Sequence, residues 1–376
     1  MRRQERWEYL GSAPRIAWDA VARGRYRFVF DTMPVVVRGM SWPARRNLLA
    51  AGLNLAHRRP RPWSWPLHMQ VELTSFCELE CPVCPTGIGE LERSASAIDP
   101  DLLDQVIGEV GPYLLTLSLW AWGEPLLYKH LARALDIVSR YPMATLLSTN
   151  GQSLNTPRVQ EALRQHPPTY LIVAIDGLTD ETNSVYRKGA RLAPALEGVR
   201  ALADWKQRSG SRYPVLHCRF MAMRQNEHEV PRLREFAAAA GFDMVSLRSL
   251  SIIDSAEQSH RNMVPVDELL RAYRYEQGVR VQRRDFVCQH ASTFPTILAD
   301  GRVVACEQDF NGQQAYGVLE KGGSFRDIWQ SAAASEVRRT IRDRPGEYSF
   351  CRNCPYADRP ISSCSFASYA VRPFEA

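Results

Sequence analysis

Three cysteines stand close together in the stretch VELTSFCELECPVCPTG, which covers residues 71 to 87. Cys77, Cys81 and Cys84 have the spacing Cys-x3-Cys-x2-Cys and follow an alternating apolar segment typical of a β-strand. Three thiolates on one short loop can hold three irons of a cubane iron–sulfur cluster and leave the fourth iron without a protein ligand. A site one ligand short can bind and activate an exogenous molecule, so the loop predicts a catalytic metal site. The alternative is a zinc knuckle or a group of core thiols.

A second group of cysteines lies near the C-terminal end, at Cys288, Cys306, Cys351, Cys354 and Cys364. The segment ILADGRVVAC, residues 297 to 306, predicts a hairpin whose Asp-Gly turn brings Cys306 back toward Cys288. Four cysteines can close a second 4Fe–4S cluster completely, but a zinc ribbon fits the same spacings. The remaining cysteine, Cys218, stands in an apolar strand and is predicted to be a core thiol.

Between the two groups, short apolar segments alternate with helical ones. We predict strands near residues 69–75, 114–120, 144–149, 170–175, 214–222 and 243–250. The predicted helices lie near residues 99–110, 129–140, 156–165, 193–208 and 228–240. Such alternation predicts parallel strands joined by right-handed crossovers.

Polar motifs follow the predicted strands. They are Trp122-Gly123-Glu124-Pro125, Ser148-Thr149-Asn150-Gly151, Ile175-Asp176-Gly177 and Tyr186-Arg187-Lys188-Gly189. Each of the first three also reads as an ordinary turn or a helix cap. Their shared position after strands is what favours a function, because sites in parallel α/β folds gather at the C-terminal ends of strands.

The cysteine loop and these motifs resemble the radical S-adenosylmethionine (SAM) superfamily. The resemblance implies a partial (β/α)6 TIM-like barrel whose open iron chelates SAM. In that family the motif after the second strand is Gly-Gly-Glu-Pro, and here Trp122 replaces the first glycine. Ala174 likewise replaces the serine of the Ser-Ile-Asp-Gly stretch after the fourth strand. The residues that the resemblance assigns to SAM are Gly123, Glu124, Pro125, Ser148, Asn150, Asp176 and Arg187.

The resemblance implies a role for several of these residues. Glu124 and Gly123 are expected to accept hydrogen bonds from the SAM ammonium. Ser148 and Asn150 are expected at the ribose hydroxyls. Asp176 is expected to contact SAM or substrate. Arg187 is expected to pair with the SAM carboxylate, since its planar fork of donors suits that group.

The C-terminal cysteines resemble the SPASM/twitch extension of radical SAM enzymes, including a small helix around Ile328-Trp329 before the final Cys-x2-Cys. The full SPASM pattern has seven cysteines and two auxiliary clusters. The smaller number here resembles the single-cluster twitch form. It implies Cys288, Cys306, Cys351 and Cys354 as ligands of an auxiliary 4Fe–4S cluster and leaves Cys364 without a role.

Composition narrows the remaining possibilities. The 376 residues are 45% hydrophobic, enough for a large core. The sequence shows neither a long apolar run nor a secretory signal, and nine cysteines then predict a reducing cytoplasm. We expect a basic helical segment at 1–65, a core barrel at 66–255, a linker or helix at 256–285 and the auxiliary domain at 286–376.

The basic character belongs to the first of these segments. Residues 1 to 65 hold thirteen arginines, four acidic residues and five tryptophans, a local charge of +9 in a chain of +6. The main body is therefore slightly acidic, and no nucleic-acid partner is expected. Leu48, Leu49, Leu53 and Ala56 recur at helical spacing after a helix start at Ser41-Trp42-Pro43. These features suit either helices packed under the barrel or a peripheral contact with an anionic membrane.

The resemblance implies that a reductant such as flavodoxin or ferredoxin starts reductive cleavage of SAM to a 5′-deoxyadenosyl radical. That radical takes hydrogen from an unactivated C–H bond, and the auxiliary cluster accepts the substrate electron. The expected outcome is oxidation, by dehydrogenation or cross-linking, of a small molecule, lipid or glycan. Two alternatives are a peptide-modifying maturase and a non-catalytic iron–sulfur sensor or electron carrier.

Overall fold

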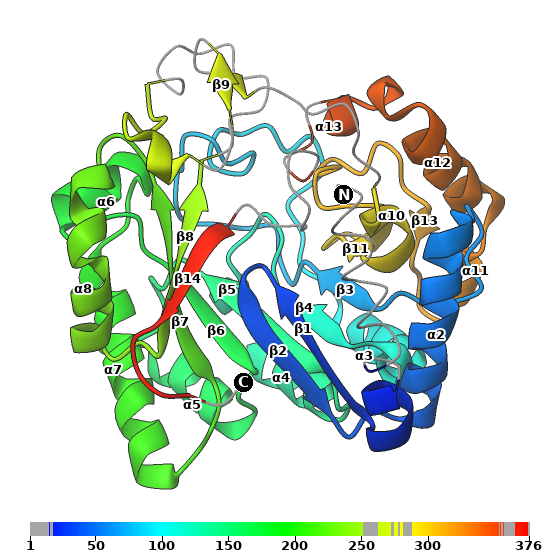
Figure 1. Cartoon of the computed structure of the whole chain (residues 1–376), viewed down its shortest axis with the longest axis horizontal. Coiled ribbons are helices and arrows are strands. Elements are labelled where there is room, and N and C mark those ends of the chain that lie inside the picture. Colours follow the sequence, from blue (N-terminus) through cyan, green and yellow to red (C-terminus); the bar gives the residue numbers. More distant parts are fainter. Residues whose placement is uncertain are drawn as a thin grey trace.

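A curved sheet of parallel strands runs through the middle of the molecule, with helices along its outer face (Figure 1). The computed structural model describes residues 15, 18–250, 262–271, 274–276, 279–280, 288–352, 354, 356 and 365–374. The six central strands are β3 His68–Val71, β4 Thr116–Ser118, β5 Ala144–Thr149, β6 Tyr170–Ala174, β7 Val215–Ala222 and β8 Met244–Ser249. They pair in sequence order and all in parallel, so the predicted partial barrel is confirmed.

Five of the six barrel helices lie within or close to their predicted ranges. The six helices are α3 Pro100–Val110, α4 Leu131–Ser139, α5 Pro157–Gln165, α6 Asp180–Tyr186, α7 Leu192–Ser209 and α8 Leu233–Ala240. The short helix α6 was not predicted, because its seven residues are too few for a clear apolar period. The odd-numbered side chains of β3, Met69 and Val71, are buried in one core with helix residues such as Leu103 and Ile107. The even-numbered positions therefore face the interior of the barrel.

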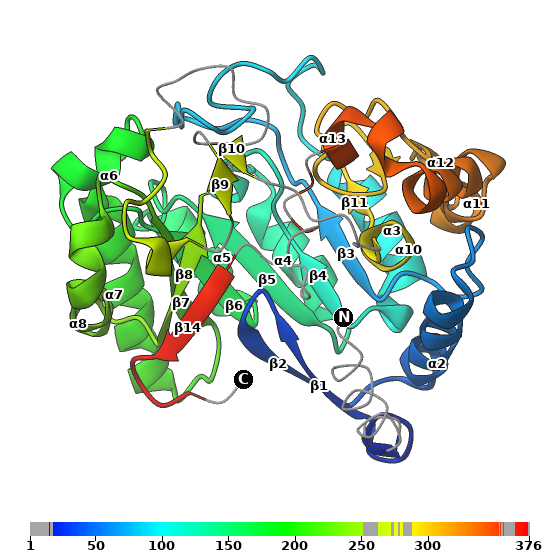
Figure 2. The same ribbon diagram turned by 45° about the horizontal axis from the view of Figure 1, so that its top comes forward.

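The C-terminal part extends the same sheet at both edges (Figure 2). Strand β11 pairs in parallel with β3, and β12 and β13 continue outward from it, while β14 runs antiparallel to β8. The remaining elements are α10 His290–Thr293, β11 Thr296–Ile297, β12 Arg302–Val304, β13 Gly317–Val318, α11 Phe325–Trp329, α12 Ala332–Asp343, α13 Ser349–Arg352 and β14 Ser365–Ala370. The predicted hairpin with its Asp-Gly turn is confirmed by β11 and β12, and the predicted small helix by α11.

The N-terminal segment contains a β-hairpin, which corrects the expectation of a helical segment. Strands β1 Arg25–Phe30 and β2 Met33–Arg38 pair around a tight turn at Asp31 and Thr32, both with positive φ. The hairpin lies across the inner face of the sheet, in front of β4, β5 and β6 (Figures 1 and 2). Met33 shares a buried core with Leu146 and Ile172, so the hairpin fills the interior of the barrel.

Helix α2 Trp42–His57 begins at the predicted position but packs with the opposite face. Its buried residues are Ala44, Asn47, Ala51 and Asn54, whereas Leu49 and Leu53 are exposed. The Asn47 amide group donates to the Trp65 and Pro66 carbonyls at 3.3 Å and accepts from the Trp65 N–H at 2.8 Å. The segment that follows α2, residues 58–66, is thus fastened to the helix by buried asparagine side chains.

Two further regions bear on the expected domains. The linker expected at 256–285 falls largely outside the described residues; the part that is described includes the short strands β9 Tyr275–Glu276 and β10 Val279–Arg280. Cys364 also lies outside the described residues. Of the helices that the structure describes, none is both long enough and apolar enough to cross a membrane.

The hairpin packing predicts unequal effects of two substitutions on the same element. Met33 is fully buried, so Met33→Ala should lower the free energy of unfolding by about 2–5 kcal/mol. Val29 is 63% exposed, and Val29→Ala should change the free energy of unfolding by less than about 0.5 kcal/mol. Urea unfolding of the cluster-free protein, followed by circular dichroism, measures both. Equal, small effects would show that the hairpin is not part of the core.

Candidate active site and second cysteine site

The loop that carries Cys77, Cys81 and Cys84 begins directly after β3 and turns back on itself. The Cys84 N–H donates to the Cys81 carbonyl at 3.1 Å, which closes the turn between these two cysteines. Gly87 packs against it so closely that a Cβ there would approach the Cys81 backbone nitrogen to 2.5 Å. The loop therefore brings Cys84 back beside Cys81, and the assignment of all three cysteines to one cluster stays a prediction.

The thiols of this loop lie in apolar surroundings. Cys81 is buried in a cluster with Leu79, Tyr186 and Met223, and Cys77 packs against that cluster. Burial raises the pKa of Cys77 to about 12 and the pKa of Cys81 to about 11. Proximity of the two sulfur atoms adds to the rise at Cys77. These thiols lie close together in apolar surroundings, and ionising them without a metal is unfavourable. This fits a cluster whose iron ions would stabilise the thiolates.

The Gly-Glu-Pro turn packs against the backbone just before the cysteine loop. A Cβ at Gly123 would come within 1.9 Å of the Thr74 carbonyl oxygen, so only glycine allows this approach. The Glu124 N–H donates to the Phe76 carbonyl at 2.7 Å. Pro125 then starts a short 3₁₀-helix at Pro125–Leu127. The turn is thereby fixed beside Cys77, where the resemblance expects SAM.

The Glu124 carboxylate is buried and already accepts three hydrogen bonds. Its donors are the Leu126 N–H at 2.9 Å, the Thr149 hydroxyl at 2.6 Å and the Asn150 N–H at 2.7 Å. Burial raises the pKa of Glu124 to about 7, although these donors oppose the rise. A carboxylate has about four acceptor positions, so room for one further donor remains. The expected hydrogen bond to the SAM ammonium stays a prediction.

Asn150 and Ser148 lie at the end of β5, on either side of Thr149. The Asn150 amide nitrogen is 3.8 Å from the Cys77 sulfur, and its oxygen accepts from the Gln152 N–H at 2.9 Å. Asn150 is buried, whereas Ser148 is partly exposed. Asn150 is thus turned toward the first cysteine site, and the ribose contacts of both residues stay predictions.

Asp176 and Arg187 form a buried ion pair beside the cysteine loop. The Arg187 Nε lies 2.7 Å from the Asp176 Oδ2, but neither of these two atoms is in hydrogen-bond geometry. The other oxygen, Oδ1, accepts from the Met221 N–H at 2.7 Å. Arg187 also lowers the pKa of Cys81, which places the guanidinium near that sulfur. The pair therefore places a buried guanidinium, held by Asp176, beside the cysteine loop.

The second group of cysteines surrounds one cavity. It is lined by Cys288, Cys306, Cys351 and Cys354, together with His290, Tyr356 and five further residues. Burial raises the pKa of the Cys288, Cys306 and Cys351 thiols. Their mutual proximity raises those of Cys306 and Cys351 further. The structure thus brings together all four cysteines that the sequence assigned to an auxiliary cluster. The cavity and its four thiols fit a fully ligated cluster.

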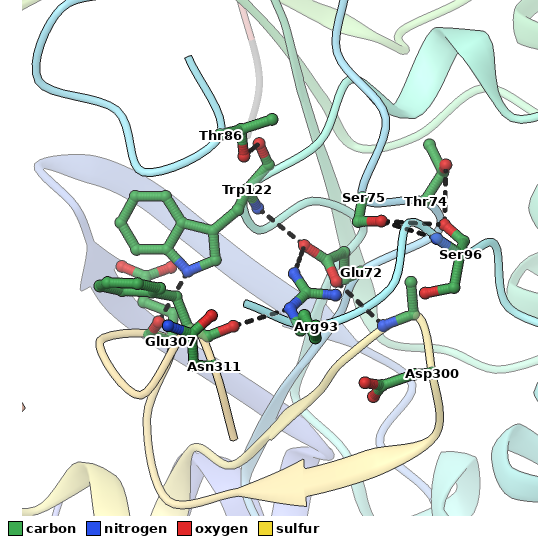
Figure 3. Close-up of polar contacts among 12 residues, drawn as sticks. Glu72, Thr74, Ser75, Thr86, Arg93, Ser96, Trp122, Asp300, Glu307 and Asn311 are labelled. Carbon is green, nitrogen blue, oxygen red and sulfur yellow. Dashed lines mark hydrogen bonds and ion pairs between the residues drawn. The ribbon is translucent and has the colours of Figure 1, made fainter. Parts of the chain in front are cut away.

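Several residues at these sites were not predicted from the sequence. His290 lies 4.0 Å from the Cys306 sulfur through its Nδ1, and burial lowers its pKa to about 4, so it stays neutral. Figure 3 shows a second unpredicted group, in which Glu72, Arg93, Trp122 and Glu307 connect the first site to the second. No local signal marks them, because their partners are far away in the sequence. Cys218, by contrast, is confirmed as a core thiol.

Fold and site together define an enzyme class. A partial barrel with an open three-cysteine loop at the end of its first strand, extended by a four-cysteine cavity, is an iron–sulfur enzyme that acts on SAM. The model of the radical SAM superfamily matches residues 71–237, and the model of the SPASM iron–sulfur cluster-binding domain matches residues 288–355. The chain belongs to the radical SAM superfamily and carries a C-terminal SPASM domain. Its cofactors are SAM and 4Fe–4S clusters, and the zinc alternatives are set aside.

Relatives and solved structures match about four fifths of this chain. The PqqA peptide cyclase of Gluconobacter oxydans is 23% identical over 326 residues, covering 81% of this chain and 87% of that protein. The tungsten-containing aldehyde ferredoxin oxidoreductase cofactor-modifying protein of Pyrococcus furiosus is 22% identical, covering 80% and 89%. The crystal structure of Streptococcus suis SuiB bound to precursor peptide SuiA has a TM-score of 0.57 at 14% identity, covering 82% of this chain and 75% of SuiB. The last match shows a shared fold.

The two cysteine sites predict an iron count. Anaerobically reconstituted protein should bind about eight irons, because each cubane holds four. Changing Cys77, Cys81 and Cys84 together to Ala should leave about four irons, as should the same change at the four cysteines of the cavity. Cys218→Ala, which removes a buried core thiol, is the control and should leave the count unchanged. Iron and zinc are measured by inductively coupled plasma mass spectrometry, and about four irons with one zinc in the wild type would contradict the second cluster.

Proposed function

We propose that the protein is a maturase that oxidises a peptide substrate by radical chemistry. The observation that carries the proposal is the match of curated peptide cyclases across four fifths of this chain. The fold shared with SuiB, whose structure was solved with its precursor peptide, agrees with it. This substrate class is favoured over the small molecule, lipid or glycan that the sequence favoured. The net change is an oxidation, as a cross-link or a double bond.

When bound, the cofactors supply reductive cleavage of SAM and removal of hydrogen from a C–H bond, with flavodoxin or ferredoxin as reductant. The chain supplies the arrangement. Cys77, Cys81 and Cys84 hold the first cluster. Arg187, beside Cys81, orients the SAM carboxylate, and Asp176 in turn keeps that guanidinium in place.

The remaining residues complete the SAM site. Glu124 and the backbone of Gly123 receive the ammonium. Asn150, with its amide 3.8 Å from the Cys77 sulfur, and Ser148 hold the ribose. Apolar packing around the loop excludes water, which would otherwise compete for a reactive intermediate. The four cysteines of the cavity would hold the auxiliary cluster, which would supply an acceptor for the substrate electron.

Deuterium transfer can identify the substrate class. Cells of the source organism are grown in deuterated medium, and their extract is separated into lipid, small-molecule and peptide fractions. Each fraction is incubated anaerobically with unlabelled SAM, reductant and enzyme. We expect deuterium in 5′-deoxyadenosine only with the peptide fraction, because hydrogen is removed directly from the substrate.

Two controls complete the experiment. Protease treatment of the peptide fraction should abolish the label, and the variant with alanine at Cys77, Cys81 and Cys84 should cleave no SAM. Label that survives protease, or that appears with the lipid or small-molecule fraction, would contradict the peptide substrate. Mass spectrometry of the modified peptide then shows the loss of two hydrogens.

We also propose that the outer face of α2 contacts an anionic membrane surface. Trp42, Leu49, Leu53 and the nearby Trp63 are each between 47% and 64% exposed. Arginines flank them: Arg45 stacks on Trp42 with its guanidinium carbon 5.1 Å from the ring centre, and Arg59 stacks on Trp63 at 3.9 Å. Exposed aromatic and aliphatic side chains mixed with arginine suit anionic headgroups.

Vesicle binding tests this surface. The wild type should sediment with phosphatidylglycerol vesicles at low salt and be released by high salt, since charge attraction is screened. Leu49→Glu with Leu53→Glu should weaken binding by about 1.5–3 kcal/mol for each leucine that no longer inserts. Leu269→Glu, at a still more exposed leucine outside α2, is the control and should bind normally. If the wild-type protein does not sediment with anionic vesicles at low salt, the proposed membrane contact is wrong.

A further inference from the structure

We propose that Trp122 is a positioning residue that fixes the first cysteine loop, which carries Cys77, Cys81 and Cys84, against a second loop. The second loop is residues 305–316, between β12 and β13, and carries Cys306. It occupies the position where the family pattern has glycine, and a glycine there would have no side chain to reach across. The proposal rests on the proposed function in that both loops hold clusters. It adds a residue that determines how those loops are placed relative to each other.

The backbone around Trp122 is hydrogen-bonded to the first loop. Its carbonyl accepts from the Thr86 hydroxyl at 2.6 Å, and Thr86 stands two residues beyond Cys84. On the other side, the Glu124 N–H donates to Phe76, the residue before Cys77, at 2.7 Å. The turn at residues 122–124 is therefore attached to both ends of the first cysteine loop.

The side chain of Trp122 contacts the second loop. Its indole Nε1–H donates to the Glu307 carbonyl at 2.7 Å, and Glu307 follows Cys306 directly. The ring also packs edge-on against Phe310, with ring centres 5.7 Å apart. Figure 3 shows the indole between the first loop, reached through Thr86, and the loop that carries Glu307. One residue thus bonds to both loops, within two residues of Cys84 and one residue of Cys306.

The Glu307 side chain extends the connection. Its carboxylate accepts from the Gln70 amide at 2.6 Å and from the Tyr356 hydroxyl. Gln70 lies on β3, the strand that leads into the first loop, and Tyr356 stands two residues beyond Cys354. Since the carboxylate is held from both sides, the Glu307 carbonyl is a fixed acceptor for the indole. Because this acceptor is itself held in place, the indole bond can fix the turn at residues 122–124, and with it the first cysteine loop, relative to the second loop.

Trp122→Phe keeps an aromatic ring and removes the N–H donor, which isolates the hydrogen bond. The matched control is Asn311→Ala, which removes two hydrogen bonds across the same boundary, to Glu92 and Glu90, and touches neither Trp122 nor Glu307. Iron content, and SAM cleavage without substrate, should stay near wild type in both. Product formed per 5′-deoxyadenosine should fall about tenfold in Trp122→Phe alone, because displacement of about 1 Å can cost up to 100-fold.

Two measurements do not depend on turnover. Hydrogen exchange in the cluster-free protein should be faster over residues 304–310 in Trp122→Phe than in Asn311→Ala. Pulsed electron paramagnetic resonance on the reduced, loaded protein should show a broader distribution of distances between the two clusters in Trp122→Phe. If both variants behave alike in exchange and in cluster distance, Trp122 only packs at a boundary and the proposal is wrong.

A second variant covers the case in which Trp122→Phe does not fold. Thr86→Val removes the hydroxyl bond from the other side and should give the same uncoupling and the same exchange pattern. The effects of the two substitutions should be less than additive, because both act through one connection. If wild-type enzyme cleaves SAM but modifies no peptide, the proposed function fails, while exchange and cluster distance still decide the role of Trp122.

Discussion

A buried ion pair between Glu72 and Arg93 lies where the two cysteine loops meet, and both side chains are completely shielded from solvent. The Arg93 Nη2 is 2.7 Å from the Glu72 Oε1. That carboxylate also accepts from the Trp122 N–H at 3.2 Å and the Ala299 N–H at 2.9 Å, while the Arg93 Nε donates to the Phe310 carbonyl at 2.7 Å. Loss of one partner from such a pair typically costs about 3–5 kcal/mol, because the other charge stays buried. Both charges belong to the barrel, and each is bonded to a backbone group of the auxiliary domain, Glu72 to the Ala299 N–H and Arg93 to the Phe310 carbonyl. Separating the two parts would therefore take a hydrogen-bond partner from each buried charge.

This constraint explains why the sheet continues without interruption from the barrel into the C-terminal part. Ala299 lies between β11 and β12, so its bond to Glu72 aligns the β11 edge with β3. The inner face of the sheet must be covered in another way, since a partial barrel leaves that face open to solvent. The hairpin covers that face, and Asp31 at its turn reaches Arg219 of β7 at 2.5 Å. The basic N-terminal segment is in this way joined to the core through both apolar packing and charge.

Much of this fold could be predicted, because its signals are local. The six strands follow from apolar segments at regular spacing, and the β11–β12 hairpin follows from an Asp-Gly turn. The β1–β2 hairpin could not be found in that way. Its turn, Asp31-Thr32, lacks the glycine or asparagine that usually allows positive φ, and Pro34 interrupts the apolar run. The buried face of α2 was equally hidden, because Asn47 and Asn54 are polar and are buried only through bonds to a distant backbone.

The candidate sites show the same division. The sequence predicted that Cys288 and Cys306 lie close together, because the Asp-Gly turn between them is a local signal for a hairpin. Both residues line the same cavity. The Glu72, Arg93 and Trp122 network depends on partners up to about 230 residues away, which no local pattern can indicate. No sequence motif marks Glu307, and only the fold gives it Gln70 and Tyr356 as partners. Residues that hold a cofactor were thus predictable from their chemistry, whereas residues that position it were not.

Burial gives both cysteine sites a common property. With a pKa of about 12 for Cys77 and about 11 for Cys81, the cluster-free thiols stay protonated at neutral pH. At these two residues the thiolate is therefore favoured only when iron offsets the desolvation, so cluster assembly should release protons. The same dryness protects a radical intermediate from water once SAM is bound. A more exposed loop would ionise and load more easily, but it would lose the exclusion of water on which the chemistry depends.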